Sequence, residues 1–110
     1  MAQQNLVINQ GETFSQTIQV LDNLGNVFDL TNYSIRGQMR KSYTSSTFQD
    51  LHPTLSNTPT DGFFTISLSS TDSAALKAGR WVYDVEIISP GSVVTRVSEG
   101  IISVTPEVTR

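Results

Sequence analysis

His52 is the only histidine in the chain, so any chemistry that needs an imidazole would have to be built around it. A catalytic histidine requires a nucleophile and an orienting group within hydrogen-bond reach. The surrounding stretch "DLHPTL" shows no nucleophile-elbow motif such as G-x-S-x-G. A zinc site needs three or four ligands from histidine, cysteine or carboxylate groups, and the chain has no cysteine. We therefore interpret His52 as a solvated loop residue and predict no catalytic residue, no metal site and no cofactor.

Asp84 and Glu86 stand two positions apart in "RWVYDVEII", which alternates as a β-strand does. Both carboxylates are then expected on one face of the strand, about 7 Å apart, a separation that suits a pair of glycosidase carboxylates. Trp81 and Tyr83 point to the opposite face, so no aromatic sugar platform lies beside the two acids. Arginines on neighbouring strands offer ionic partners instead, and an exposed ladder of ion pairs explains the residues better. We predict that the protein is not an enzyme.

The stretch "SIRGQMRKSYTSST" gathers Arg36, Arg40 and Lys41, three of the seven basic residues, within six positions. Nucleic-acid binding requires a clear positive excess, whereas this chain has a net charge of −3. Arg36 and Arg40 occupy alternate positions of a strand whose other face is apolar. We predict that they pair with Asp84 or Glu86, and that nucleic acid is not a partner.

The chain is long enough for one domain around a single core, with 110 residues and only 15% charged residues. Short stretches with one apolar face alternate with turn signals, which predicts strands. The predicted apolar faces are Phe14, Ile18 and Val20; Ile35, Gly37 and Met39; Phe64, Ile66 and Leu68; and Trp81, Tyr83, Val85 and Ile87. The pattern predicts an all-β fold, an immunoglobulin-like antiparallel β-sandwich of about seven strands with one short connecting helix.

That helix is expected within "SSTDSAALKAG", with Ser70 or Thr71 as its N-cap and Gly79 just past its end. Gly100 is expected to mark a β-bulge in the last strand, because the apolar register shifts around it.

Residues 1–110 form a single predicted domain with three irregular parts: an N-terminal arm (1–10), a long polar loop (41–61) and a C-terminal tail (106–110). Weak strands are expected near Phe48 and Leu51 and near Leu55 within the loop. The start of the sequence has neither a basic region nor an apolar region typical of a signal peptide, and no stretch is long and apolar enough for a membrane span. The expected site of synthesis is the cytoplasm, without a membrane partner.

Two longer stretches carry a family resemblance. "LDNLGNVFDLTNYSIRGQMRKS" combines an aspartate-led turn, the "DLT" of residues 29–31 and an alternating strand, and "DGFFTISLSSTDSAALKAGRWVYDVEI" combines a strand, a short helix and an aromatic strand. With the closing "TRVSEGIISVTPEVTR", the order of these motifs resembles the immunoglobulin-like amino-terminal domain of tailed-bacteriophage baseplate upper proteins. The resemblance covers roughly residues 11–109.

The resemblance implies a non-enzymatic structural protein of a phage virion, assembled in the host cytoplasm and docked to other virion proteins in the baseplate, tail, neck or capsid decoration. Self-association in a symmetric oligomer is an open alternative. The predicted docking parts are the arm, the loop and the tail. The partner-binding residues in them are Asn5, Leu6, Val7, Ile8, Tyr43 and Phe48.

A different class of function also stays open. The chain is then a carbohydrate-binding module that helps a particle hold a glycan of the host surface. Its candidate aromatic residues are Tyr33, Tyr43 and Phe48.

Overall fold

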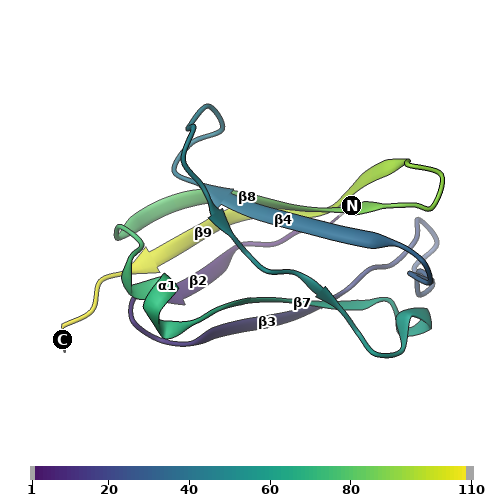
Figure 1. Ribbon diagram of the computed structural model, residues 1–110, viewed down its shortest axis with the longest axis horizontal. Coiled ribbons are helices and arrows are strands. Elements are labelled where there is room, and N and C mark those ends of the chain that lie inside the picture. The colour runs from purple at the N-terminus through teal and green to yellow at the C-terminus, as the bar shows by residue number, and fades with distance from the viewer. Residues whose placement is uncertain (1, 109–110) are drawn as a thin grey trace.

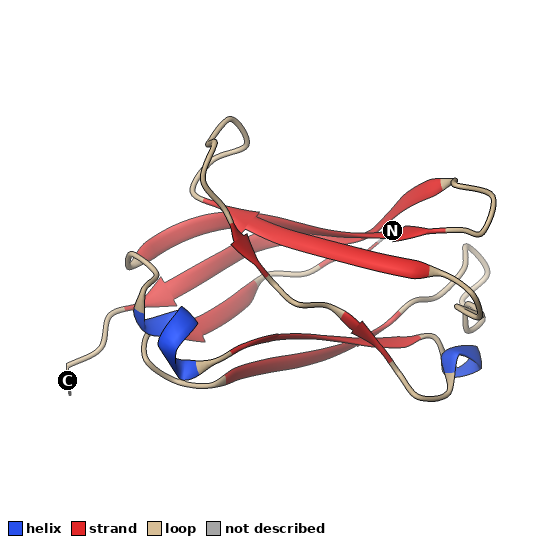
Figure 2. Cartoon of the chain, viewed as in Figure 1, coloured by secondary structure: helices blue, strands red, loops and turns tan. Residues whose placement is uncertain are grey.

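The computed structural model describes residues 2–108, so Met1 of the predicted arm and Thr109 and Arg110 of the predicted tail lie outside the described residues. Two β-sheets face each other as the layers of a sandwich (Figure 1). The predicted all-β immunoglobulin-like sandwich is confirmed. Among residues 2–108, helix is confined to two short segments near opposite ends of the sandwich (Figure 2).

The first sheet has the strand order β1-β9-β8-β4-β5, and β2 also pairs with β9. The second sheet has the order β3-β7-β6. The strand bounds are β1 Ala2–Gln3, β2 Leu6–Asn9, β3 Phe14–Gln19, β4 Ser34–Arg40, β5 Gln49–Asp50, β6 Thr54–Leu55, β7 Phe63–Leu68, β8 Gly79–Ile88 and β9 Val94–Thr105. The helical segments are the 3₁₀ turn η1 Pro59–Asp61 and the helix α1 Ser70–Ala74.

The core lies between the sheets and follows the alternation in the sequence. Every second residue of β7 and β8 is buried, including all members of the apolar faces predicted at 64–68 and 81–87. These faces exclude water from the space between the layers, and the hydrophobic effect stabilises the fold through them. Tyr83 is buried with its hydroxyl satisfied, because Tyr83 Oη donates to Gln4 O at 2.6 Å.

The sequence predicted a free N-terminal arm, but the structure pairs this segment with the sheet. β1 and β2 run parallel to β9 of the same chain, with Leu6 beside Ile102 and Ile8 beside Val104. Leu6 and Ile8 are buried in the core. The prediction of an entirely antiparallel fold is therefore wrong for this edge, where a parallel strand adds to the last one without a short turn between them.

The segment 41–61 is not one continuous polar loop. Leu51 is fully buried, its amide donates to Gly37 O at 3.0 Å, and its carbonyl accepts from Ser67 N at 2.9 Å. The chain thus crosses from the first sheet, which β5 joins, to the second sheet, which β6 joins. The weak strands expected near Leu51 and Leu55 are confirmed, while the loop itself is shortened to the residues between β4 and β5.

The helix α1 begins one residue earlier than predicted. Ser69 is the N-cap, and its Oγ accepts from Asp72 N at 3.1 Å. The helix ends at Ala74, so Gly79 is not a helix cap but the first residue of β8. The prediction failed because "ALKAG" has helical composition but leads directly into a strand.

The register shift of the last hairpin lies at Val97, not at Gly100. Val85 pairs with Ser98 and Glu86 with Arg96, so Val97 is the extra residue. Gly100 has another reason to be glycine: its φ is +154°, and a Cβ there would lie 2.4 Å from Gln4 O. The close approach of the N-terminal segment to β9 requires the missing side chain.

Candidate functional site

The outer face of the first sheet carries ion pairs. Arg36 lies opposite Glu86 in the β4–β8 register, and Arg36 Nε is 2.8 Å from Glu86 Oε1, which confirms the predicted pair. In β9, Arg96 Nε lies 3.5 Å from Asp84 Oδ2, and Arg96 Nη1 lies 3.3 Å from Glu99 Oε1. These side chains are substantially exposed, so each pair contributes only about 0–1 kcal/mol.

Arg40 does not join this ladder, and its predicted pairing with Asp84 or Glu86 is wrong. Arg40 Nη1 donates to Ser45 O at 2.6 Å, and Nη2 donates to Gln38 Oε1 at 3.0 Å. Its guanidinium also lies 5.0 Å from the centre of the Phe48 ring. Arg40 therefore holds together the two ends of the loop that follows β4.

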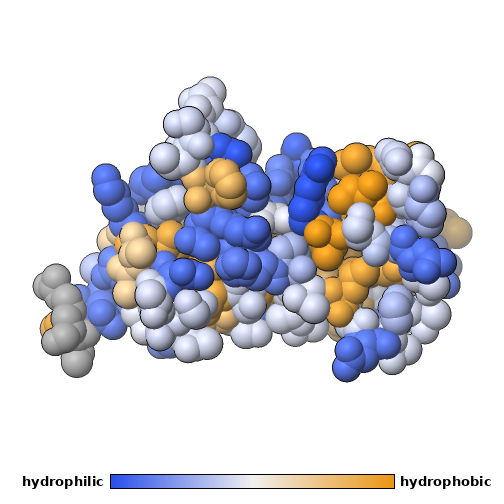
Figure 3. Space-filling model, in the orientation of Figure 1, coloured by the Kyte–Doolittle hydropathy of each residue, from blue (hydrophilic) through white to orange (hydrophobic). Residues whose placement is uncertain are grey.

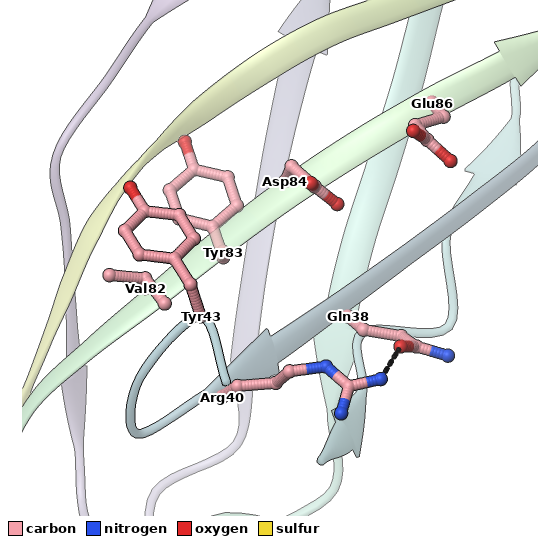
Figure 4. A pocket seen from close by; sticks show the side chains of 7 residues that line it. All are labelled: Gln38, Arg40, Tyr43, Val82, Tyr83, Asp84 and Glu86. Atoms are coloured by element: carbon pink, nitrogen blue, oxygen red, sulfur yellow. Dashed lines mark hydrogen bonds between the residues drawn. The ribbon is translucent and has the colours of Figure 1, made fainter. Parts of the chain in front are cut away.

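This loop borders a hollow of about 250 Å³ on the outer face of the first sheet. Figure 4 shows Gln38 and Arg40 projecting from β4, Asp84 and Glu86 along β8, and Tyr43 on the loop. The other lining residues are Val82 and Tyr83. Tyr43 is 83% exposed, so its ring is free to stack on a ligand. The amide, guanidinium and carboxylates of the hollow can hydrogen-bond a polar, hydroxyl-bearing molecule.

Burial raises the pKa of the Asp84 carboxyl, because partial removal from water disfavours its charged form. The neighbouring Arg96 opposes that shift, and the carboxylates of Glu86 and Glu99 reinforce it. Asp84 thus occupies an environment that is unfavourable for its charge even with an arginine beside it.

The predicted partner-binding residues fall into two groups. Asn5, Leu6, Val7 and Ile8 lie in or beside β2, where Asn5 Oδ1 accepts from Ile101 N at 3.1 Å, and only Val7 presents a large apolar side chain to solvent, at 59% exposure. Tyr43 and Phe48 are exposed on the loop after β4, on the side of the hollow. Contact of any of these residues with a partner stays a prediction.

The three aromatic residues considered for sugar stacking are not arranged as one platform. Tyr33 packs edge-on against Phe28, with ring centres 5.6 Å apart and an angle of 84° between the planes. Phe48 lies beneath the Arg40 guanidinium, which leaves Tyr43 as the ring at the hollow.

His52 lies on the surface, as predicted, with its Nε2 3.7 Å from Asp72 Oδ2. Within residues 2–108 no group of three or more histidine, cysteine or acidic side chains is placed to hold a metal ion. No helix in that part of the chain is long and apolar enough to cross a membrane.

Sequence reasoning missed a group of exposed apolar side chains at one end of the sandwich, which we call the apolar end. Its residues, each between 47% and 85% exposed, are Leu21, Leu24, Val27, Val93 and Val94. They come from the segment between β3 and β4, from the β8–β9 turn and from the first residue of β9, all toward the right-hand end of Figure 1. Figure 3 shows hydrophobic residues gathered at that end.

A groove of about 540 Å³ continues the apolar end between the two sheets. Half of its lining residues are apolar (Val20, Leu21, Phe28, Ile87 and Val97), and the other half are polar or charged (Gln19, Asp22, Asn23, Thr95 and Arg96). The sequence already indicated one exposed apolar residue, because Leu24 lies inside the turn signature "DNLGN" and a residue in a surface turn is not expected to be buried in the core. An exposed leucine in a turn is informative only when other apolar residues lie beside it, and that requires the fold.

The two facing sheets place the chain in the class of immunoglobulin-like all-β domains. No protein-family model and no curated protein matches the sequence. Among solved structures, the chain is similar to the internalin-like protein lmo2027 of Listeria monocytogenes, with 18% sequence identity and a TM-score of 0.49. The match covers 92% of this chain and 27% of that protein.

Proposed function

We propose that this chain is a non-enzymatic structural protein of a tailed-bacteriophage particle, assembled in the host cytoplasm, which docks to other virion proteins. The order of the sequence motifs between residues 11 and 109 supports the phage assignment. The single observation that supports docking is the apolar end, where Leu24 is 85% exposed and Val93 is 63% exposed.

An exposed apolar cluster of this kind lowers its free energy by leaving water, and contiguous clusters mark interaction sites. Burial of one such side chain contributes about 1.5–3 kcal/mol. The adjoining groove gives a partner side chain somewhere to insert, as anchor residues do at the centres of protein interfaces. A partner that offers an apolar segment to this end therefore fits the surface.

The test is incorporation into particles. An antibody raised against the recombinant protein is applied to gradient-purified particles from a lysate of the cells that encode it, with immunogold microscopy to locate the label. A virion protein sediments with intact particles and labels one position on them. Protein found only in the soluble fraction would contradict the proposal.

The role of the apolar end is tested separately with a double variant, Leu24→Asp with Val93→Asp. Both side chains are exposed, so the fold is expected to persist. The variant should fail to enter particles when it replaces the wild-type protein. Thr44→Asp with Ser46→Asp is the matched control, since it adds the same two negative charges on an exposed loop away from the apolar end. Equal incorporation of both variants would exclude the apolar end as the docking surface.

A second candidate function is glycan binding at the hollow, favoured by the exposed Tyr43 ring beside Gln38 and Asp84. Saturation-transfer NMR with polysaccharide from the host surface tests it. Transfer that disappears in Tyr43→Ala and persists in Phe48→Ala would support this function. Absence of transfer with the wild-type protein would reject it for that polysaccharide.

A further inference from the structure

β3 is an edge of the second sheet, because that sheet has the order β3-β7-β6. Ser67 N donates to Leu51 O, so the backbone of Ser67 faces away from β3. Ser67 lies opposite Ser15, and in an antiparallel ladder both members of such a pair face outward. By the same alternation, the backbone N–H and C=O groups of Ser15, Thr17 and Gln19 point away from β7, in the plane of the sheet, toward the space beyond its edge.

This edge lacks the usual features that prevent strand pairing. Its sequence, "FSQTIQ", contains no charged residue and no proline. The other edge strand of the same sheet, β6, has only two residues, whereas β3 has six. Ser15 and Thr17 are exposed, and a second strand at this edge has to displace the Gln16 side chain, whose Nε2 donates to Thr17 O at 3.5 Å.

The outer face of the second sheet is also uncharged. It presents Ser15, Thr17 and Gln19 from β3, Phe63, Thr65 and Ser67 from β7, and Thr54 from β6. Thr17 Oγ1 and Thr65 Oγ1 are 3.0 Å apart within this face. The ion pairs of Arg36 and Arg96 lie on the other sheet, so within β3 itself no charged side chain faces its copy, despite the net charge of −3.

We propose that two copies of the chain pair through β3, antiparallel about a two-fold axis at Thr17. This register sets Thr17 opposite Thr17 of the partner subunit and Ser15 opposite Gln19 of the partner subunit. Each opposed pair joins outward-facing backbone groups, which gives about six hydrogen bonds, two for each of the three pairs. The two polar faces then form one continuous face, and the two three-stranded sheets become a single sheet.

The same register places Glu12 near Asp22 of the partner subunit at each end of the pair. Both residues are exposed and lie outside the strand, where dissolved salt screens their repulsion. The dimer is therefore expected to tighten as the ionic strength rises. The pairing does not depend on the proposed function, because it uses a different surface from the apolar end.

The experiment is light scattering across a concentration series with three proteins: the wild type, Thr17→Lys and Thr17→Asp. The wild-type mass should rise to twice the monomer mass. Each variant alone should dissociate about tenfold more readily or more, because like charges face each other across the axis. A one-to-one mixture of the two variants should recover the dimer, because opposite charges then face each other.

Thr65→Lys is the matched control, since it adds the same charge to the same face on the central strand β7 and should leave the dimer intact. Thermal unfolding of each variant confirms that it is folded. A wild-type protein that stays monomeric, or forms a trimer or larger ring, would overturn the proposal. So would a Thr17→Lys dimer as tight as the wild type, or a mixture that stays monomeric.

Discussion

Gly100→Ala is expected to detach the N-terminal segment from β9. A Cβ at position 100 would lie 2.4 Å from Gln4 O and 2.9 Å from Gln4 C. Both atoms belong to the backbone, so a change of side-chain rotamer cannot relieve the contact. The φ of +154° adds strain for a residue with a Cβ. The segment around Gln4 must therefore move away.

The cost follows from the hydrogen bonds that this movement breaks. They are Gln4 N to Glu99 O at 2.8 Å, Tyr83 Oη to Gln4 O at 2.6 Å and Ile101 N to Asn5 Oδ1 at 3.1 Å. At about 1 kcal/mol each, the loss is about 3 kcal/mol of the free energy of unfolding. If the movement reaches Leu6 and Ile8, exposing each adds about 1.5–3 kcal/mol.

The assay is urea unfolding combined with hydrogen exchange at the amides of Gln4 and Ile101. Gly25→Ala is the control, because Gly25 also has positive φ, +81°, but nothing lies within 4 Å of a Cβ built there. That variant should lose only about 1–2 kcal/mol through backbone strain. A Gly100→Ala protein no less stable than Gly25→Ala, with both amides still protected, would refute the close-approach explanation.

Three further substitutions test the core and the charged face. Leu51→Ala should lower the free energy of unfolding by about 2–5 kcal/mol, measured with urea, because Leu51 is fully buried where the chain crosses between the sheets. A loss near zero would show that this segment does not contribute to the core. Tyr83→Phe should cost about 1–3 kcal/mol by leaving Gln4 O without its donor. Burial raises the pKa of Tyr83, so wild-type stability should fall as the pH rises past 10.0, and Tyr83→Phe should remove that fall, as thermal unfolding against pH would show. The pKa of Asp84 is also raised, so the folded state loses stability as the pH rises through the folded-state pKa and the carboxyl becomes charged. Asp84→Asn should therefore have a larger free energy of unfolding than the wild type at pH 7, and this gain should disappear below pH 3.8. A variant that is less stable than the wild type at pH 7 would show that the charge of Asp84 stabilises the fold.

The sequence predicted the position and the core face of strands that have one buried face and one solvent-exposed face. Phe64, Ile66 and Leu68 alternate strictly, so their periodicity identified both the strand and its core face. The same pattern in β8 correctly separated Tyr83 from Asp84. Alternation also made the Arg36–Glu86 pair predictable, since both residues lie on the wet faces of strands that become neighbours.

Pairing between distant segments was not predictable in the same way. "NLVIN" has an alternating pattern that fits any sheet edge, and nothing local states that its neighbour is β9 of the same chain. Leu51 is a single buried residue in a polar segment, so no period shows its burial. The groove beside the apolar end combines residues about 70 positions apart in the sequence, Leu21 and Val97 among them, and only the fold brings them together.

The choice between protein docking and glycan binding depends on what each surface must give up on binding. The polar groups of the hollow already bond to one another or to neighbours: Arg40 to Gln38 and Ser45, Asp84 to Arg96, and Glu86 to Arg36. A sugar would have to replace these interactions with equal ones, so its net gain is small. Leu24 and Val93 have no comparable interactions to lose, because water is their present neighbour and its release is favourable. The apolar end therefore offers the larger driving force, which supports the proposal that the partner is a protein.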